Sequence, residues 1–215
     1  MGAFAVVWTP VRVLREIAGE RNLLAGFVVV ALNAALGLGG VAVLLFGGNL
    51  QAQLEASGAQ LPQGFFEGFA VIALVLAVLA PFVWWLLISL IMHLVTRFFG
   101  GEGPLSATFA AVGVAFVPLV LSTVVSIPLG GLQAVLETGS VAGTAIGLLS
   151  NLLALAFLVW HAVLVVIGAA LARNISYGES TGSCAISCGG CLGLIILVIV
   201  ALSVVAALFS GAVQQ

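Results

Sequence analysis

The strongest constraint in this sequence is a set of long apolar stretches that contain no charged residue. Residues 69–95 form one of them and residues 141–172 another. Each exceeds the roughly 20 residues that a helix needs to cross the hydrocarbon of a bilayer. In lipid every backbone polar group must be paired within the protein, so only helices or a closed barrel can span. Barrel strands would alternate in character over about 10 residues, and no such segments occur. The sequence predicts an all-α integral membrane protein.

Composition supports one integral domain. The chain has 215 residues, of which 63% are hydrophobic and 6% charged, whereas soluble domains carry about 25% charged residues. We expect a single five-helix transmembrane domain over residues 22–215, with the lipid bilayer as its first partner. Its predicted spans are about 23–46, 69–95, 107–129, 141–172 and 189–209.

Residues 1–21 predict a short amphipathic helix that enters the domain. Thr9 suits the N-cap and Pro10 the first helical position. One face is apolar, formed by Val11, Leu14, Ile17 and Ala18. We expect this segment to lie in the membrane interface. A helix that covers the cytoplasmic end of the bundle is the alternative.

The placement of charge predicts the orientation. All five basic residues are arginines, and they precede the first span or follow the second and fourth. Cytoplasmic segments are enriched in Arg and Lys. We therefore predict a multi-pass protein of the cell membrane with a cytoplasmic N-terminus and an external C-terminus. No basic tail or patch indicates nucleic-acid binding.

Two segments share a weak parallel repeat. Trp85 aligns with Trp160, Arg97 with Arg173, and Glu102 with Glu179. Each segment would be a helical hairpin with a cytoplasmic turn, at 96–104 and 174–183. Spans two and three would then pair antiparallel, as would spans four and five. The glutamates could meet the arginines in these turns, where ion pairs contribute little.

The three cysteines lie close together at the start of the fifth predicted span. An odd number argues against a disulfide framework. Small residues at helix contacts let backbones approach closely, so helix packing is the favoured role. Palmitoylation is the next alternative, and an iron–sulfur or other metal site is the third. The predicted packing residues are Cys184, Cys188, Cys191, Gly189 and Gly193.

Four polar residues in or near predicted spans are candidates for an intramembrane role: His161, His93, Asn33 and Asn151. His161 lies 12 residues before Arg173, near mid-bilayer, where an imidazole needs a partner. A proton relay or a metal pair is one hypothesis. A neutral histidine bonded to an asparagine or a backbone carbonyl is favoured, because no acidic residue or lysine lies within a span. No motif of metalloproteases, serine hydrolases or phosphate loops occurs. We expect no catalytic residue, cofactor or metal site.

Short motifs along nearly the whole chain resemble the Yip1 domain family. They are Thr9-Pro10 with Leu14-Arg15-Glu16-Ile17, Gly100-Gly101-Glu102-Gly103 with Ser106, Val117-Pro118-Leu119, and Ser176-Tyr177-Gly178-Glu179-Ser180. The resemblance implies five spans. Eukaryotic members are Golgi and endoplasmic-reticulum proteins that engage small GTPases, whereas prokaryotic members have no agreed activity. This chain lacks the long polar N-terminal region of many eukaryotic members and looks like a minimal prokaryotic-type member. The resemblance therefore does not imply that it binds GTPases.

These observations favour a non-enzymatic membrane protein. Its expected role is membrane organisation or interaction with other membrane proteins, or with further copies of itself, within the bilayer. A small transporter or channel is the alternative, supported by the hairpin repeat, the prolines in or at the spans and the deep polar residues. A membrane-embedded enzyme that uses the Cys or His residues is a third, weaker hypothesis.

Overall fold

A computed structural model describes residues 2–46, 65–136, 140–187 and 189. Within these ranges every regular element is a helix. The elements are η1 (Ala3–Val7), α1 (Pro10–Glu20), α2 (Leu23–Phe46), α4 (Phe65–Phe98), α5 (Leu105–Val114), α6 (Val117–Val135) and α7 (Val141–Arg173). Residues 177–187 form a further helix.

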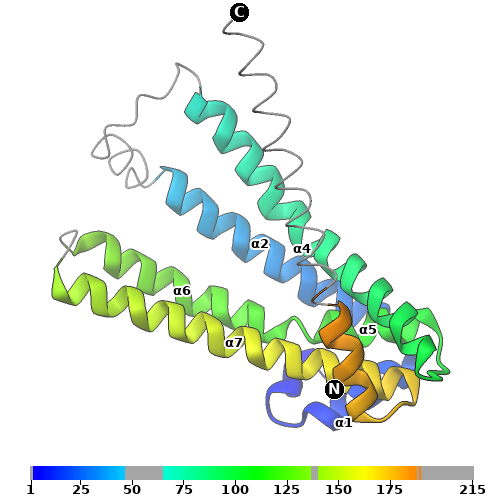
Figure 1. Cartoon of the computed structure of the whole chain (residues 1–215). Helices are drawn as coiled ribbons and strands as arrows, with labels where there is room; N and C mark the ends of the chain where they lie inside the picture. Colours follow the sequence, from blue (N-terminus) through cyan, green and yellow to red (C-terminus); the bar gives the residue numbers. More distant parts are fainter. Residues whose placement is uncertain (1, 47–64, 137–139, 188, 190–215) are drawn as a thin grey trace, which may run out of the picture.

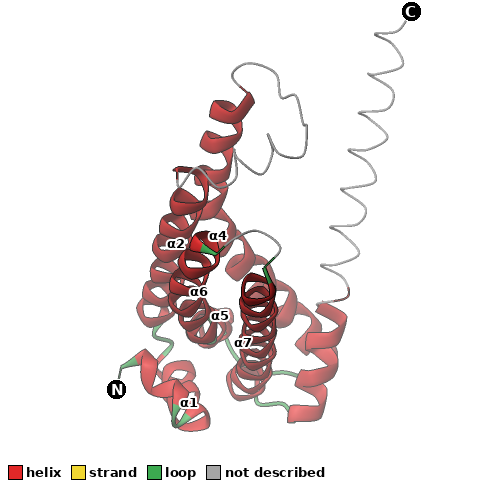
Figure 2. Ribbon diagram, turned by 90° about the vertical axis from the view of Figure 1, so that its left-hand side faces the viewer, coloured by secondary structure: helices red, strands yellow, loops and turns green. Residues whose placement is uncertain are grey.

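Two helix pairs diverge from a shared end, the base, where α1, α5 and the 177–187 helix lie. α2 packs along α4, and α6 packs along α7. Figure 1 shows the pairs spreading apart from the end where α1 and α5 lie, and Figure 2 shows α1 and the 177–187 helix at that same end. The core is concentrated there, and its largest fully buried side chains include Phe116, Leu14, Met92 and Leu164.

Four helical segments are long and apolar enough to cross a membrane: Leu23–Ala42, Gly68–Phe98, Leu105–Gln133 and Val141–Arg173. For the described residues, the prediction of an all-helical fold with segments able to cross a membrane is therefore confirmed. Of the fifth predicted span, 189–209, only Gly189 belongs to the described residues. The predicted count of five lies beyond what this structure tests.

The third predicted span, 107–129, is not one continuous helix. α5 ends at Val114 and α6 begins at Val117. Pro118 has no N–H for the carbonyl four residues earlier. The N–H of Leu119 donates to the Phe116 carbonyl at 2.9 Å instead of continuing the helical pattern to Ala115. The break therefore leaves the Ala115 carbonyl free for another donor.

The predicted pairing of spans two and three holds only for the first half of span three. α5 packs against α4, but beyond the break α6 packs along α7 and α2. The predicted turn at 174–183 is also wrong in part, because helix resumes at residue 177. Arg97 is exposed whereas Arg173 is buried, so these two repeat-related arginines occupy different environments.

The apolar face of α1 packs on protein. It buries Val13, Leu14, Ile17 and Ala18, and α1 contacts α5 and α7. Val11, which the sequence placed on this face, is exposed instead. Trp8, just before α1, is 85% exposed. The helix covers the base of the bundle, and interfacial placement stays a prediction for its outer side.

α5 lies at the centre of this base, and small residues along it let the neighbouring helices approach closely. Ala107, Ala111 and Ala115 are all buried, as their four-residue spacing predicts. Glycine lies at two close helix crossings, and the crossing at Gly113 is the tighter one. A Cβ at Gly113 would lie 2.6 Å from the Cα of Gly26 in α2, and a Cβ at Gly168 of α7 would lie 3.2 Å from the Cβ of Ala111.

Candidate functional site

The most elaborate polar arrangement joins Arg173, at the end of α7, to the turn between α4 and α5. Arg173 is only 2% exposed. Its guanidinium donates to the carbonyls of Gly101 and Gly103, and its Nε donates to Thr96 Oγ1 at 3.2 Å. The backbone N–H of Glu102 donates to the Arg173 carbonyl at 2.8 Å. These bonds fix the end of α7 to the α4–α5 turn from both directions.

The glycines of this turn make the approach possible. Gly100 has a φ of 76°, a conformation that favours glycine. A Cβ at Gly101 would lie 2.8 Å from the Thr96 carbonyl oxygen, and a Cβ at Gly103 would collide with the Ala172 carbonyl. The sequence identifies these residues as a tight turn, but their second role is to receive Arg173.

Glu179 caps a helix. Its Oε2 accepts from the N–H and hydroxyl of Ser176, both at 2.8 Å, and its own N–H donates to the Ser176 hydroxyl at 3.2 Å. These reciprocal bonds form a capping box at the start of the 177–187 helix. The bonds from the Ser176 N–H and then from its hydroxyl hold the pKa of the Glu179 carboxyl below its usual value. The Ser-x-x-Glu spacing is the sequence signal for this helix start.

Serines on the same helix attach it to the base. The Ser180 hydroxyl donates to the Val166 carbonyl at 2.7 Å, and the Ser187 hydroxyl lies 3.4 Å from the Met92 sulfur. The 177–187 helix therefore contacts both α7 and α4. On α4, the buried Ser89 hydroxyl has no hydrogen-bond partner within the described part of the chain.

His161 of α7 lies at the break between α5 and α6. It is 5% exposed, and its Nδ1 lies 2.7 Å from the Ala115 carbonyl oxygen. A carbonyl only accepts, so Nδ1 carries the hydrogen. The ring also packs edge-on against Phe116, with centroids 4.9 Å apart. His161 thus satisfies the acceptor that the Pro118 break leaves free.

The other three polar candidates lie apart from His161. His93 Nδ1 is 3.3 Å from Thr108 Oγ1, at the base. Asn151 is exposed on α7 and donates to the Gly147 carbonyl within its own helix. Asn33 is half-buried in α2. The structure does not gather the four into one site.

The predicted cysteine cluster is only partly described. Cys184 is buried at the base, whereas Cys188, Cys191 and Gly193 lie outside the described residues. A Cβ added to Gly189 would meet nothing within 4 Å. No described contact therefore supports close packing at Gly189, and a packing role for the cluster stays a prediction. Among the described residues, no three His, Cys, Asp or Glu side chains are placed to hold a metal.

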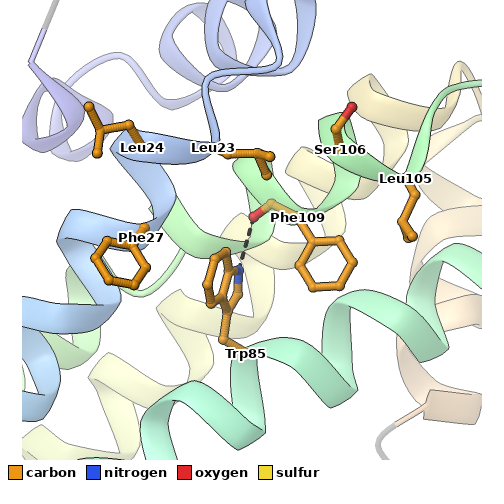
Figure 3. A pocket seen from close by; sticks show the side chains of 7 residues that line it. All are labelled: Leu23, Leu24, Phe27, Trp85, Leu105, Ser106 and Phe109. Carbon is orange, nitrogen blue, oxygen red and sulfur yellow. Dashed lines mark hydrogen bonds between the residues drawn. The ribbon is translucent and has the colours of Figure 1, made fainter.

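A groove of about 620 Å³ lies between the starts of α2 and α5 and the middle of α4. Figure 3 shows the side chains that line it, which are Leu23, Leu24, Phe27, Trp85, Leu105, Ser106 and Phe109. The Trp85 indole N–H donates to the Phe109 carbonyl at 2.9 Å, and the two rings meet edge to face. The walls are apolar except for the Ser106 hydroxyl and the Trp85 indole N–H, which is already bonded to the Phe109 carbonyl. The sequence places Trp85 deep in a predicted span but does not indicate the groove, because its walls come from three separate helices.

Comparison with known proteins identifies the family of this chain. The family model for the Yip1 domain matches residues 4–202, nearly the whole chain. Neither the curated proteins nor the solved structures gave a match. The match includes the α4–α5 turn, the Pro118 break and the Ser176–Glu179 box. The chain belongs to the Yip1 domain family.

Proposed function

We propose that this protein is a non-enzymatic organiser of the membrane that associates, within the bilayer, with other membrane proteins or with further copies of itself. The supporting observation is the divergence of the two helix pairs from one base. Only 11% of the apolar spanning segment in α4 is buried inside the protein, against 56% of the segment that α5 and α6 form. α4 therefore presents long apolar faces to its surroundings.

These faces suit lateral contact with other helices. Exposed side chains follow the length of α4 and α7, among them Val75, Leu79, Leu152 and Leu155. Association between spanning helices depends on packing of such surfaces and on interhelical hydrogen bonds. α4 and α7 both pack against α5 in the base, and beyond it their outer faces are exposed.

Photo-crosslinking within native membranes tests this role. A photoreactive amino acid at Leu79 or Leu152 should give discrete adducts with protein, from a partner or from a second copy. Val112, fully buried in α5, is the matched control and should crosslink only within the chain. Adducts with lipid alone at every exposed position of α4 and α7 would refute the association role.

The proposed orientation places the base on the cytoplasmic side of the cell membrane. α1 carries Arg12 and Arg15 and packs against α7, whose Arg173 contacts the turn that follows Arg97. The arginines therefore gather at one end, which the positive-inside tendency assigns to the cytoplasm.

Cysteine labelling tests the orientation. In a variant without native cysteines, Ser57→Cys should react with an impermeant reagent in intact cells, whereas Tyr177→Cys should react only after permeabilisation. Tyr177 is half exposed in the 177–187 helix and so is a fair reporter. The reverse pattern would invert the proposed topology.

Transport is the second candidate, and the broken third span favours it. Discontinuous helices at mid-membrane often form the sites of transporters. Here the break at 115–116 brings His161 to a free carbonyl. Flux of ions or solutes into vesicles that contain the purified protein, lost in His161→Gln without loss of folding, would establish transport. Its absence across a broad solute panel would favour the organising role.

A further inference from the structure

We propose that the groove between α2, α4 and α5 binds one acyl chain of a membrane phospholipid, with the lipid phosphate at the uncapped N-terminal end of α5 and within reach of Arg21, which precedes α2. This inference stands apart from the proposed association with other proteins. It rests on the groove's chemistry, on its place along the spanning helices and on the charges at its mouth.

The walls are suited to hydrocarbon and unsuited to water. A buried water needs two to four polar partners. Of the two polar groups in the wall, the Trp85 N–H already donates to the Phe109 carbonyl at 2.9 Å, which leaves the Ser106 hydroxyl as a single partner for water. The Trp85 and Phe109 rings, with Phe27 opposite, present aromatic surface (Figure 3). A volume of about 620 Å³ lies in the range of small-molecule sites.

The groove opens on the outer surface of helices that are able to cross a membrane. Leu24 is 69% exposed, and Phe27 and Leu105 are also exposed. These residues belong to segments that are long and apolar enough to cross the bilayer. An empty apolar groove in this position would forfeit dispersion contacts on one side. The nearest molecules able to restore them are the acyl chains of the surrounding leaflet.

The mouth favours a phosphate. Leu105 is the first residue of α5, and helix N-termini carry partial positive charge. The start of α2 is already capped, because Asn22 Oδ1 accepts from the Ala25 N–H at 3.1 Å. The first turn of α5 receives no side-chain cap from Pro104. Arg21 is exposed, and its carbonyl accepts from the Leu23 N–H at 2.8 Å.

Two acidic residues are near this mouth in sequence. Glu20 precedes Arg21, and Glu102 lies in the turn before α5. They disfavour a small free anion at the mouth. A phospholipid gains apolar contacts along the groove as well as contacts with Arg21, so its binding does not depend on headgroup charge alone.

Fluorescence quenching in vesicles tests the proposal on the full chain. Trp8→Phe, Trp84→Phe and Trp160→Phe together leave Trp85 as the single reporter. Phospholipid brominated in its tails is added at increasing mole fraction to unlabelled bilayers. We expect quenching of Trp85 to saturate at a low mole fraction, whereas contact with bulk lipid would make it rise in proportion.

Three variants assign the quenching to the groove and to its mouth. Ser106→Phe should fill the groove and reduce the saturable part several-fold. Leu148→Phe, on the exposed face of α7, adds the same bulk elsewhere and should change nothing. Arg21→Gln should shift the phospholipid titration to higher mole fraction but leave a brominated fatty alcohol unaffected.

Native mass spectrometry of the protein with all its tryptophans provides a second measurement. A retained phospholipid should be lost in Ser106→Phe and kept in Leu148→Phe. The proposal is overturned if Trp85 is not quenched, as when protein covers the groove. It is also overturned if quenching follows bulk lipid, if Ser106→Phe leaves it unchanged, or if Arg21→Gln leaves the phospholipid titration unchanged.

Discussion

Gly26 of α2 and Gly113 of α5 touch backbone to backbone, and a methyl group at Gly113 would lie 2.6 Å from the Gly26 Cα. The obstacle is main chain, which cannot move aside as a side chain can. Gly113→Ala should therefore force the two helices apart and destabilise the fold by about 1–3 kcal/mol, as overpacking does. Thermal unfolding in detergent would measure the loss.

Gly19→Ala is the matched control. Gly19 lies in α1, where an added Cβ meets nothing within 4 Å, so the change should be neutral or stabilising by up to about 1 kcal/mol. Equal unfolding temperatures for Gly113→Ala and the unmodified protein would show that α2 and α5 do not cross this closely.

Arg173→Lys should weaken the base although it keeps the charge. A guanidinium reaches two carbonyls and a hydroxyl in a fixed fork, whereas an ammonium is a compact point charge. Loss of the bonds to Gly101 and Gly103 should cost about 2 kcal/mol or more, because hydrogen bonds to charged groups contribute about 1.5–3 kcal/mol each. Proteolysis near the α4–α5 turn and thermal unfolding would both report it.

Arg97→Lys is the control for this change, since Arg97 is exposed and a surface substitution should alter stability by no more than about 0.5 kcal/mol. If both lysine variants unfold at the same temperature, the contacts of Arg173 do not stabilise the base.

His161→Leu should leave the Ala115 carbonyl without its donor. Within membranes such interhelical bonds contribute about 0.6 kcal/mol on average, so we expect a loss of about 1 kcal/mol or less. His161→Gln can still donate and should lose less. Asn151→Leu, which removes a bond within one exposed helical turn, should leave α6 and α7 in place. A larger loss for His161→Gln than for His161→Leu would contradict this role.

The Ser176–Glu179 box should make the 177–187 helix sensitive to acid. The pKa of Glu179 is lowered in the fold by bonds from the Ser176 N–H and hydroxyl. Its ionised form is therefore favoured on folding. The resulting stability is present above the unfolded-state pKa and is lost as pH falls through the lower folded-state pKa. Hydrogen exchange of residues 177–187, compared between the unmodified protein and Glu179→Gln, should differ at neutral pH and converge in acid.

Ser176→Ala tests whether the acid sensitivity of the helix comes from the Ser176–Glu179 bonds or from protonation of other groups. It should cost about 1 kcal/mol of helix stability as the loss of an N-cap. In its background, Glu179→Gln should change exchange less than it does alone. An undiminished effect would mean that Glu179 acts without Ser176.

The spans were predictable because length and absence of charge determine them. Residues 23–46 and 141–172 match α2 and α7 almost to the residue. The break before Pro118 was not predictable from the sequence, because a proline within an apolar run is compatible with a kink or with a break. The pairing of α6 with α7 follows from that break, which frees α6 from the path of α5. The burial of Arg173 depends on glycines 70 residues away, and no local pattern in α7 indicates it.

The brevity of α5 has a consequence for how the protein meets its two leaflets. Ten helical residues rise about 15 Å, half of a hydrocarbon layer of about 30 Å. α5 lies in the base, so in the proposed orientation the chain would change course after it at about mid-depth. The closely packed core would then belong to the cytoplasmic leaflet, and the other leaflet would hold mainly the separated helix pairs. Lipid composition on the side of α1 should govern unfolding, whereas composition on the far side should govern how the helix pairs stand apart.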